Sequence, residues 1–526
     1  MIAIRTSYGI DSGLGHLMRM RKLAEALRVI GKDVVFLVNS KNKNSEKYLN
    51  DFTVVGLYKT NINISSFDQA NDALLCIEFL KDTKNDMVVL DSYNIGIEWE
   101  NILVNYGFKL TVFDDIQRQH NCDYLVDSKW QGNDTYSRYK RLIPERCKPL
   151  LGPSFLMVDK VCKNNFKNDK FIIMLSLGGG GDLMLFRDLL KELALINIEN
   201  VVLMPIIGDY ATNKESFIEI TKKYKNIKLV IGATDLSEYY KKTSLFIGAL
   251  GTMFYESRMF GIPAITFSIA ENQENKISDL EDFGHYFHLP LCEFKQANKV
   301  AKLIIIFIKK YKKVKKITTN PEIVIDGYGA KRVAQAITNG ENLPHKLKKD
   351  EASSTNNSEI VYVNKELIVR KIDNNDVNNY LLARNLPINS KNMLSFKKIL
   401  FIDHYLWWFS NKRYSYVVTK DHKDKIYIWH EEIFFKGQSY LVGGWFSAVK
   451  DKAFDVAFSA LEWQLNYTSK KFPESVWIAI IKKNNKYVNL LNSYLGFVSV
   501  DSNSVEFNAI EHYFGKASSE YNYVKK

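Results

Sequence analysis

Residues 1–19 read MIAIRTSYGIDSGLGHLMR, and this stretch decides the fold of the first part of the chain. The apolar run 2–5 predicts a buried strand, the glycines at positions 9, 13 and 15 predict a turn, and residues 17–30 predict a helix. A strand, a glycine turn and a helix in this order are typical of a parallel α/β domain. Free amides at the start of such a helix favour an anion, although the turn alone is equally compatible with tight packing.

Further strands alternate with helical stretches on both sides of residue 150. In the first part we expect strands at 33–38, 87–90 and 110–113, and in the second at 171–175, 200–203, 227–231, 245–247 and 263–267. This alternation predicts an α/β fold with two Rossmann-like domains, one over residues 1–150 and one over residues 151–340. Ligands of such sheets bind beyond the carboxyl ends of the strands, so the pair is expected to enclose a substrate cleft.

The sequence changes character after residue 340. Residues 341–358 are polar and charged without hydrophobic periodicity, which predicts a linker. Beyond it, residues 359–526 predict a separate α+β domain. Its expected helices cover 373–384, 404–411, 454–466 and 486–495, and its expected strands cover 415–420, 425–435, 438–447 and 476–481.

Composition excludes several classes of protein. With 526 residues, 46% of them hydrophobic and 25% charged, the chain has the composition of a folded multidomain protein. Its longest apolar runs, 303–308 and 440–446, are far shorter than the roughly 20 residues that span a bilayer, and its N-terminus lacks the pattern of a signal peptide. We therefore expect no membrane span and a cytoplasmic location.

The net charge of +13 comes from lysines that are spread along the chain rather than gathered into one arm. This distribution argues against nucleic acid as a partner and suits anionic small substrates such as nucleotide sugars and coenzyme A. The sequence does not indicate an oligomeric state.

Neither the cysteines nor the histidines predict a metal site. The five cysteines lack paired metal spacing, and their odd number argues against a complete disulfide framework, so reduced thiols are expected. His120, His285 and His288 have no convincing set of carboxylate or cysteine companions. We expect a metal-independent protein.

The spacing of Arg5, Gly13, Gly15, His16 and Arg19 resembles the opening of the UDP-2,4-diacetamido-2,4,6-trideoxy-altropyranose hydrolases of pseudaminic acid biosynthesis. Similar segments follow in the same order at 89–93, 112–115, 121–125 and 151–153. The resemblance covers about residues 1–340. It implies two Rossmann-like domains in a glycosyltransferase-B-like arrangement, a UDP-amino sugar as substrate, and transfer of the sugar to water.

The same resemblance implies roles for residues of the first domain. His16 is implied as the base that acts on water, which suits a side chain whose ordinary pKa of about 6.5 is close to physiological pH. Tyr93 and Asp91 are implied to orient the water or the sugar, although a plain strand end and loop is an alternative reading of both. Gly13, Gly15 and Arg19 are expected at the substrate. The family often has an aspartate where this chain has Ser7, and Asp11 is a candidate replacement.

In the second domain, four consecutive glycines follow the first strand and predict either a diphosphate loop or a hinge; Gly178 and Gly179 are the expected ligand contacts. Gly251 and Thr252 lie between a strand and a helix, where amides and a hydroxyl can meet phosphate oxygens. The remaining expected contacts, implied by the resemblance, are Glu256 as acceptor for ribose hydroxyls and the amide pair Asn272 and Gln273. A solvated helix glutamate is the alternative for Glu256.

Residues 381–385, 402–408, 476–481 and 495–497 resemble segments of GNAT-type N-acetyltransferases. This resemblance implies acetyl-CoA as co-substrate, with Lys450 and Lys452 beside its pyrophosphate and Asn485 in its site. The loop 449–455 lacks the family's glycines, and Asn492 stands where the family's tyrosine acid is usual, with Tyr494 nearby. A degenerate domain with a structural role therefore remains an alternative.

Together the two resemblances imply one bifunctional enzyme. Its C-terminal domain would acetylate UDP-4-amino-4,6-dideoxy-N-acetyl-β-L-altrosamine, and its N-terminal domains would then release UDP and 2,4-diacetamido-2,4,6-trideoxy-L-altrose. The alternative is a UDP-sugar glycosyltransferase with a non-catalytic C-terminal binding domain.

Overall fold

The computed structural model divides the chain into two compact units, Met1–Asp350 and Glu351–Lys526. The residues that it describes are 1–9, 14–59, 67–83, 87–160, 169–196, 198–269, 273, 277–318, 321–340, 360–363, 366–391, 397–450, 454–515 and 519–526. Gly13, Asn272, Lys452 and the expected linker over 341–358 lie outside the described residues. Within the described residues, no helix has both the length and the apolarity needed to cross a membrane.

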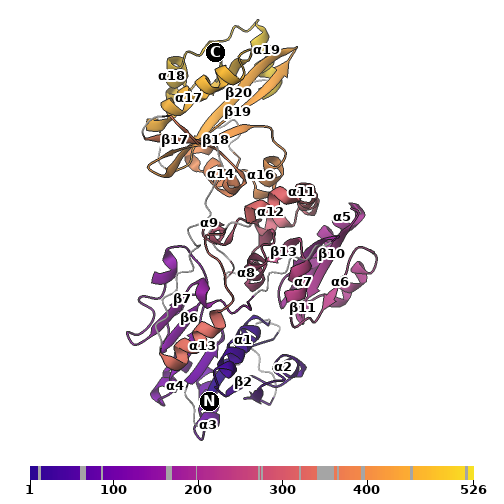
Figure 1. The fold of residues 1–526 in the computed structure, drawn as a ribbon, viewed down its shortest axis with the longest axis vertical. Coiled ribbons are helices and arrows are strands. Elements are labelled where there is room, and N and C mark those ends of the chain that lie inside the picture. Colours follow the sequence, from indigo (N-terminus) through magenta and orange to yellow (C-terminus); the bar gives the residue numbers. More distant parts are fainter. Residues whose placement is uncertain are drawn as a thin grey trace. The chain divides into compact units, whose positions relative to one another are not determined.

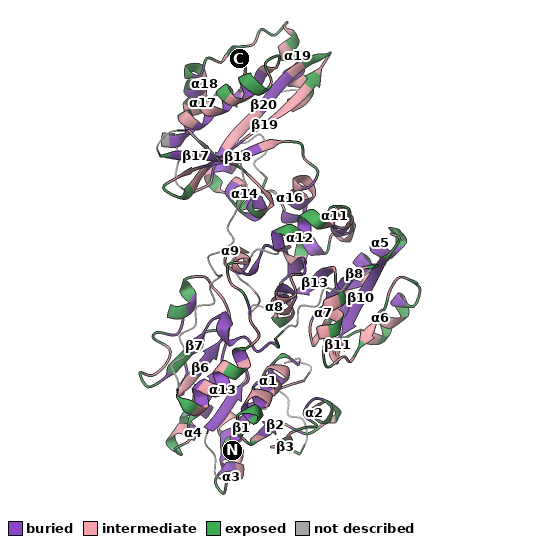
Figure 2. Ribbon diagram, in the orientation of Figure 1, coloured by how far each residue is buried: buried purple, intermediate pink, exposed green. Residues whose placement is uncertain are grey.

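The first half of unit Met1–Asp350 is a seven-stranded parallel sheet in the order β3-β2-β1-β4-β5-β6-β7. Its strands are β1 (Ile2–Thr6), β2 (Val34–Val38), β3 (Thr53–Gly56), β4 (Met87–Asp91), β5 (Leu110–Phe113), β6 (Tyr124–Asp127) and β7 (Lys148–Leu151). Most of these strands are buried on both faces, as Figure 2 shows by their purple colour. Burial of both faces is expected for a parallel sheet covered by helices.

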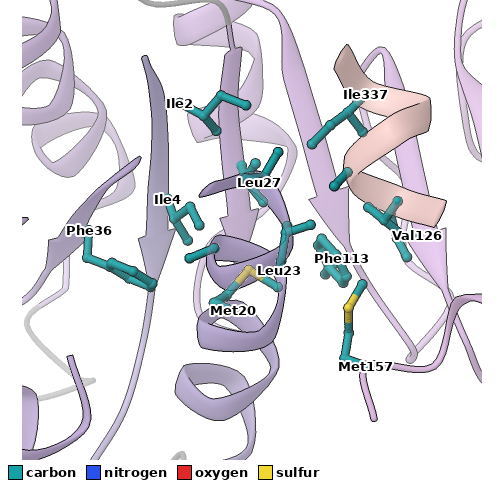
Figure 3. Packing of buried hydrophobic residues seen from close by; sticks show 14 of the residues in the cluster. Ile2, Ile4, Met20, Leu23, Leu27, Phe36, Phe113, Val126, Met157 and Ile337 are labelled. Atoms are coloured by element: carbon teal, nitrogen blue, oxygen red, sulfur yellow. The ribbon is translucent and has the colours of Figure 1, made fainter. Parts of the chain in front are cut away.

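Alternate residues of β1 enter two different cores. Ile2 and Ile4 pack with α1 (Gly15–Val29), whereas Ala3 packs on the other face with α3 (Gln69–Leu80) and α4 (Ile97–Asn105). Figure 3 shows the first core, where side chains of α1 meet those of the sheet. The spacing of Met20, Leu23 and Leu27 places all three on one face of α1, which explains why this segment is a helix that lies on the sheet.

The second half of the same unit is a six-stranded parallel sheet in the order β12-β10-β8-β13-β14-β15. Its strands are β8 (Phe171–Ser176), β10 (Val201–Ile207), β12 (Val230–Ile231), β13 (Leu245–Ala249), β14 (Ala264–Phe267) and β15 (Phe287–His288). A short parallel pair, β9 (Gly180–Asp182) with β11 (Tyr210–Thr212), lies outside this sheet. Both halves are therefore parallel α/β sheets, as the alternation of strands and helices predicted.

The chain returns to the first sheet after completing the second. Helix α13 (Gly329–Asn339) follows the second sheet in sequence, but its Val333 and Ile337 are buried in the core of the first sheet beside α1. Figure 1 shows α13 alongside α1, far from the elements that precede it in the chain. The chain thus crosses between the halves twice, and both crossing segments form part of one unit.

Unit Glu351–Lys526 contains an eight-stranded mixed sheet in the order β16-β17-β18-β19-β20-β21-β23-β22. The strands are β16 (Ile360–Tyr362), β17 (Leu367–Lys371), β18 (Tyr414–Lys420), β19 (Lys423–Phe435), β20 (Gln438–Ser447), β21 (Val476–Lys482), β22 (Val498–Ser499) and β23 (Tyr521–Lys525). Neighbouring strands are antiparallel except β20 and β21, which are parallel and share only the pairs Tyr440–Val476 and Leu441–Trp477. Residues 442–446 of β20 therefore form no ladder pair with β21, and beyond them the Asn389 side chain hydrogen-bonds the backbone of Ser447, accepting from its N at 2.9 Å and donating to its O at 2.8 Å.

Helices cover both faces of this sheet. Helix α17 (Phe454–Lys471) packs against Ile426 and Ile428 of β19, whereas α14 (Val377–Arg384) and α16 (Phe401–Trp408) pack against the opposite face, which carries Tyr427. The remaining helices of this unit are α15 (Pro387–Ser390), α18 (Lys486–Tyr494) and α19 (Val505–Phe514). This alternation along β19 follows from the two-residue period of a strand.

Several boundaries differ from the sequence-based expectation. The helix expected over 404–411 is α16 at 401–408, because the Asn411 side chain donates to the Trp408 carbonyl (2.8 Å) and ends the helix there. The helix expected from 373 begins at 377, because Asp373 and Asp376 form a capping box around a preceding 3-10 turn. The strand expected over 227–231 is reduced to Val230–Ile231, with Ile227 forming only an isolated bridge to Leu203.

Candidate active site

The expected catalytic residues gather where the strand order of the first sheet reverses. Strands β2 and β3 lie on one side of β1, and β4 begins the series on its other side. His16 is the second residue of α1, which follows β1, and Asp91 is the last residue of β4. Ligands of doubly wound sheets bind at this reversal point, beyond the carboxyl ends of the strands.

Asp91 fixes the orientation of the His16 ring. The His16 Nδ1 atom lies 2.6 Å from Asp91 Oδ1, and Asp91 is completely buried. Burial alone would raise the pKa of the Asp91 carboxyl, but the positive charge of Arg19, together with His16, outweighs it and lowers the pKa to about 2. An ionised carboxylate requires a donor at 2.6 Å, so Nδ1 carries the proton. The Nε2 atom of His16 has no hydrogen-bond partner among the described residues, and in the neutral form of the ring it is the nitrogen that accepts a proton.

Arg19 lies one turn after His16 on α1 and holds the same carboxylate. Its Nε donates to Asp91 Oδ2 at 2.8 Å and its Nη2 donates to Asp91 Oδ1 at 2.6 Å. Its Nη1 also reaches Asp115 Oδ2 at 3.4 Å. Burial opposes the charge of Arg19, but Asp91 and Asp115 together raise its pKa, so the guanidinium stays charged. Arg19, expected at the substrate, thus lies against the two carboxylates that organise the histidine.

Tyr93 contacts the histidine through its ring rather than through its hydroxyl. The two rings meet edge to face, with centroids 4.4 Å apart and planes at 82°. The Tyr93 hydroxyl donates to Asp115 Oδ1 at 2.5 Å, and burial together with Asp115 raises the pKa of Tyr93, which keeps it protonated. Asp115 was not singled out from the sequence, although two consecutive aspartates directly after a strand were a signal for it.

Arg5, the first residue of the motif, does not belong to this cluster. It is fully buried and forms a bidentate pair with Asp72, with Nε–Oδ1 at 3.0 Å and Nη2–Oδ2 at 2.7 Å. Trp99 donates to the same carboxylate at 2.9 Å. The role of Arg5 is therefore to hold α3 and α4 against the sheet. Ser7 is also internally satisfied, since its hydroxyl lies 2.7 Å from that of Ser92.

His120, in the segment between β5 and β6, is an ion-pair residue. His120 Nδ1 lies 2.7 Å from Glu100 Oε1, and its Nε2 lies 3.3 Å from Asp114 Oδ2. Burial opposes protonation, but the two carboxylates outweigh it and raise the pKa of His120 to about 9. Among the described residues, no three histidine, cysteine or acidic side chains are grouped as metal ligands would be.

The glycine loop after β8 lies directly against the turn before α1. A Cβ atom added to Gly179 would lie 2.8 Å from the Cβ atom of Leu14 and 2.9 Å from its backbone nitrogen. Gly178 has φ of +86°, a conformation that favours glycine. The absence of side chains therefore allows the two glycine turns, one from each sheet, to approach each other.

Replacing Gly179 by alanine is expected to lower the free energy of unfolding by about 1–3 kcal/mol, because the new methyl group overlaps the Leu14 backbone. Gly15→Ala is the matched control, since nothing lies within 4 Å of a Cβ at that position. Urea denaturation of both variants tests the prediction. Equal stability of Gly179→Ala and the parent chain would show that the two turns are not in contact.

The second expected phosphate contact also lies at a reversal point, between β8 and β13 of the second sheet. Gly251 precedes α8 (Thr252–Met259), and Thr252 is exposed as its first residue. The Gln273 side chain approaches this helix start, because its Nε2 lies 3.8 Å from a Cβ added to Gly251. Its Oε1 accepts a hydrogen bond from Ile269 N at 2.9 Å, which fixes the amide with its donor toward Gly251.

Glu256 is one turn further along α8 and is half-buried. Its Oε2 accepts a hydrogen bond from the Tyr240 hydroxyl at 2.8 Å. Burial raises the pKa of Glu256 to about 7, which Tyr240 only partly offsets. The carboxyl is therefore poised between neutral and ionised forms near physiological pH, and only its ionised form acts purely as the hydrogen-bond acceptor that the resemblance implied.

This raised pKa predicts a pH-dependent stability. The folded chain binds the Glu256 proton more tightly than the unfolded chain, whose glutamates titrate near pH ~4.3. The resulting stabilisation is complete below that pH and is lost as pH rises through about 7. Glu256→Gln should therefore match the parent in urea denaturation at pH ~4 and exceed it by roughly 1–3 kcal/mol at pH ~8.5. The exposed Glu215→Gln serves as control, and a constant difference across pH would contradict the prediction.

The residues expected at acetyl-CoA are in unit Glu351–Lys526. Lys450 is exposed after β20. Asn485 caps α18, with its side chain accepting from Val488 N at 3.3 Å, and Asn492 donates within the same helix to the Val488 carbonyl at 2.8 Å. Both asparagine side chains thus make local helix contacts, and Tyr494 is 77% exposed.

Comparison with known proteins finds distant relatives, and no family model matches the chain. An uncharacterised protein of Methanocaldococcus jannaschii is 24% identical over 429 residues, which are 78% of this chain and 78% of the relative. The UDP-2,4-diacetamido-2,4,6-trideoxy-beta-L-altropyranose hydrolase of Campylobacter jejuni is 21% identical over 213 residues, 40% of this chain and 76% of the relative. The chain is thus distantly related to a nucleotide-sugar hydrolase.

A third relative is the spore coat polysaccharide biosynthesis protein SpsG of Bacillus subtilis, which is 21% identical over 299 residues, 56% of this chain and 84% of the relative. Solved structures that align with the chain include MurG of Acinetobacter baumannii, with a TM-score of 0.44 and 13% identity over 64% of this chain and 99% of that one. A UDP complex of MnaA from S. aureus aligns with a TM-score of 0.46 and 13% identity over 66% of this chain and 99% of that one.

Proposed function

We propose that unit Met1–Asp350 hydrolyses UDP-2,4-diacetamido-2,4,6-trideoxy-β-L-altropyranose, with His16 as the general base. The observation that carries this proposal is the contact of His16 Nδ1 with the ionised Asp91 carboxylate, which leaves Nε2 as a proton acceptor at the reversal point of the sheet. In the proposed step, Nε2 takes a proton from water, and the water oxygen bonds to the anomeric carbon. The bond from that carbon to the UDP oxygen breaks, and UDP leaves with the electron pair.

Arg19, Asp115 and Tyr93 act in this step as positioning residues. Arg19 keeps Asp91 ionised through two hydrogen bonds, and this charge stabilises the imidazolium that forms when His16 accepts the proton. Asp115 holds both Arg19 and the Tyr93 hydroxyl, and the Tyr93 ring limits rotation of the His16 ring. Asp91 is fully buried, so we assign it no direct contact with the sugar.

The second half of the unit is proposed to bind UDP. Its glycine loop at Gly178 and Gly179 reaches the turn before His16, which would place the diphosphate close to the base. Gly251 and Thr252 offer amides and a hydroxyl at the start of α8, and Gln273 adds an amide donor. The return of α13 to the first sheet supports a glycosyltransferase-B-like arrangement of the two halves.

We further propose that unit Glu351–Lys526 has a GNAT-like fold and transfers an acetyl group from acetyl-CoA to the 4-amino group of UDP-4-amino-4,6-dideoxy-N-acetyl-β-L-altrosamine. The brief parallel pairing of β20 with β21 supports this, because residues 442–446 of β20 form no ladder pair with β21 and can accept the pantetheine arm as a further strand. Lys450 would lie beside the pyrophosphate. The amine attacks the thioester carbonyl, the carbon–sulfur bond breaks, and coenzyme A leaves as the thiol while the nitrogen loses a proton.

A single incubation separates this proposal from its alternative. The full chain is incubated with the unacetylated UDP-amino sugar, with and without acetyl-CoA, and UDP, free sugar and coenzyme A are followed by mass spectrometry. The proposal expects coenzyme A and acetylated UDP-sugar first, then UDP and free diacetamido sugar. UDP release that requires a second sugar or lipid would instead indicate a glycosyltransferase. Release of UDP without consumption of acetyl-CoA would contradict the acetyl-transfer step and favour a non-catalytic C-terminal domain.

A further inference from the structure

Two arginines enter an aromatic cluster on one face of the sheet in unit Glu351–Lys526. Tyr380, Tyr427 and Phe446 are the buried large members of this cluster. The half-buried side chains packed against them include Trp407, Trp408 and Trp429. Arg384 is the last residue of α14, and Arg413 directly precedes β18. We call this group of arginines and tryptophans the arginine–tryptophan cluster, and define it by Arg384, Arg413, Trp407 and Trp429.

The charge of Arg413 is held mainly by aromatic rings. Its guanidinium carbon lies 3.6 Å from the centroid of the Trp429 ring and 5.3 Å from that of Trp407. Within the described parts of the chain, the one carboxylate at ion-pair distance is Glu431, whose Oε2 is 3.5 Å from Nε. The same oxygen also accepts a hydrogen bond from Tyr513 at 3.2 Å. Contact with indole faces fixes the orientation of a guanidinium without neutralising its charge.

Arg384 carries a second charge close to the first. No carboxylate of the described residues forms an ion pair with it, and its buried Nη1 atom has no hydrogen-bond partner among them. Burial and the nearby charge of Arg413 both lower the pKa of Arg384. Buried donors in folded proteins are nearly always hydrogen-bonded, so an unpaired one beside a like charge indicates that an anion completes the site.

The position of the cluster separates it from the expected acetyl-CoA contacts. Trp429 is on the face of β19 that α14 and α16 cover, whereas Ile428 faces α17 on the opposite side of the sheet. Lys450, the expected pyrophosphate contact, belongs to the segment that leads into α17. The arginine–tryptophan cluster therefore lies on the opposite side of the sheet from the expected pyrophosphate contact, among α14, α16 and β19.

We propose that the arginine–tryptophan cluster binds the nucleoside diphosphate part of the acceptor, with Arg384 and Arg413 on its phosphates and a tryptophan ring against its base. Guanidinium groups match phosphate oxygens with paired hydrogen bonds, and indole faces stack on nucleobases. The inference rests on the proposed acetyl transfer to a nucleotide sugar. It gives the chain a second nucleotide site, separate from the one at Gly178 and Gly251.

Photolabelling of the full chain with 5-azido-UDP, followed by peptide mapping, tests this site. We expect labelled peptides in both units, including one that contains Trp407 or Trp429. Arg384→Gln and Arg413→Gln should each lower the label in unit Glu351–Lys526 at least tenfold. The label in unit Met1–Asp350 should stay unchanged and serves as the internal control for labelling, and urea denaturation of each variant checks that unit Glu351–Lys526 is folded. Lys423→Gln, which removes an exposed lysine at the start of β19, is the matched charge control and should label as the parent does.

Competition distinguishes UDP from coenzyme A, since both have phosphates for the arginines and a base for a tryptophan ring. Unlabelled UDP should displace the label from unit Glu351–Lys526, and coenzyme A should not. Displacement by coenzyme A but not by UDP would overturn the inference, as would the absence of label from this unit in the parent chain. Arg413→Lys, which keeps the charge but loses the planar fork, should also lower the label, and full labelling of this variant and of both glutamine variants would contradict the assignment.

Acetyl transfer is measured on the same preparations. Labelling that depends on the arginines without any acetyl transfer would leave the nucleotide site standing and refute the proposed activity of this unit. Acetyl transfer without labelling of this unit would refute the nucleotide site and leave the proposed activity standing.

Discussion

His16→Ala should release UDP from the proposed substrate about 10²–10⁴-fold more slowly than the parent chain, with the loss in kcat rather than in KM. The reason is that Nε2 is the proton acceptor left available when Nδ1 donates to Asp91, and loss of a positioned general base has this size of effect. The measurement is steady-state UDP release from the diacetamido substrate. UDP affinity should change little, because the expected nucleotide contacts belong to the second sheet.

The control for this variant is His512→Ala, which removes an exposed histidine from α19 in the other unit. It should release UDP at the parental rate. Full activity of His16→Ala would remove the named base and, with it, the proposed first step. Loss of UDP affinity in parallel with kcat would instead indicate that the turn before α1 had collapsed.

Asp91→Asn should affect both activity and stability. The amide cannot hold the Nδ1 proton as the carboxylate does, so the ring is free to adopt the other tautomer, and UDP release should fall at least about 10²-fold. Arg19 also loses its main negative partner. Breaking a buried ion pair is costly, and we expect unfolding to become easier by roughly 3 kcal/mol. Urea denaturation and steady-state kinetics of the same preparation measure the two effects.

Asp68→Asn is the matched control, since it makes the same chemical change at an exposed position. Asp68 caps α3 by accepting from Ala70 N and Asn71 N, and asparagine caps helices equally well. Stability and activity of this variant should be parental. If Asp91→Asn were as stable and as active as Asp68→Asn, the charge on Asp91 would have no part in the mechanism.

The local pattern of apolar residues and glycines predicted the strands and the helix that carry the candidate active site. The apolar runs predicted β1, β4, β8 and β13, and the predicted C-terminal ends of these strands lie within two residues of the observed ends. Because strand ends in a parallel sheet meet at one edge, this prediction also placed the residues that follow these strands near the site. The position of His16 at the start of a helix followed from the glycine turn before it, whereas its role as base was implied by the resemblance of this segment to the altropyranose hydrolases. The strand series of the C-terminal unit was predicted for the same reason, by two-residue alternation and short turns.

What the sequence could not predict depends on contacts between distant residues. Arg19 and Asp115 are 96 residues apart, and nothing local to Asp115 distinguishes it from Asp114. Arg5 belongs to the motif but faces Asp72 behind the sheet, since adjacent residues of a strand point to opposite faces. The raised pKa of Glu256 arises from burial on folding, and the approach of Gly179 to Leu14 arises from the packing of the two halves. Such features follow from tertiary structure alone.

Hydrolysis in H₂¹⁸O without any added acceptor tests the central claim most directly. The full chain is supplied with UDP-2,4-diacetamido-2,4,6-trideoxy-β-L-altropyranose as the sole sugar, and the products are weighed by mass spectrometry immediately after quenching. Because water attacks the anomeric carbon with His16 as base, we predict equimolar UDP and free sugar, with ¹⁸O in the sugar and none in UDP. Release of UDP only after a sugar or lipid acceptor is added, or ¹⁸O in UDP, would contradict the account.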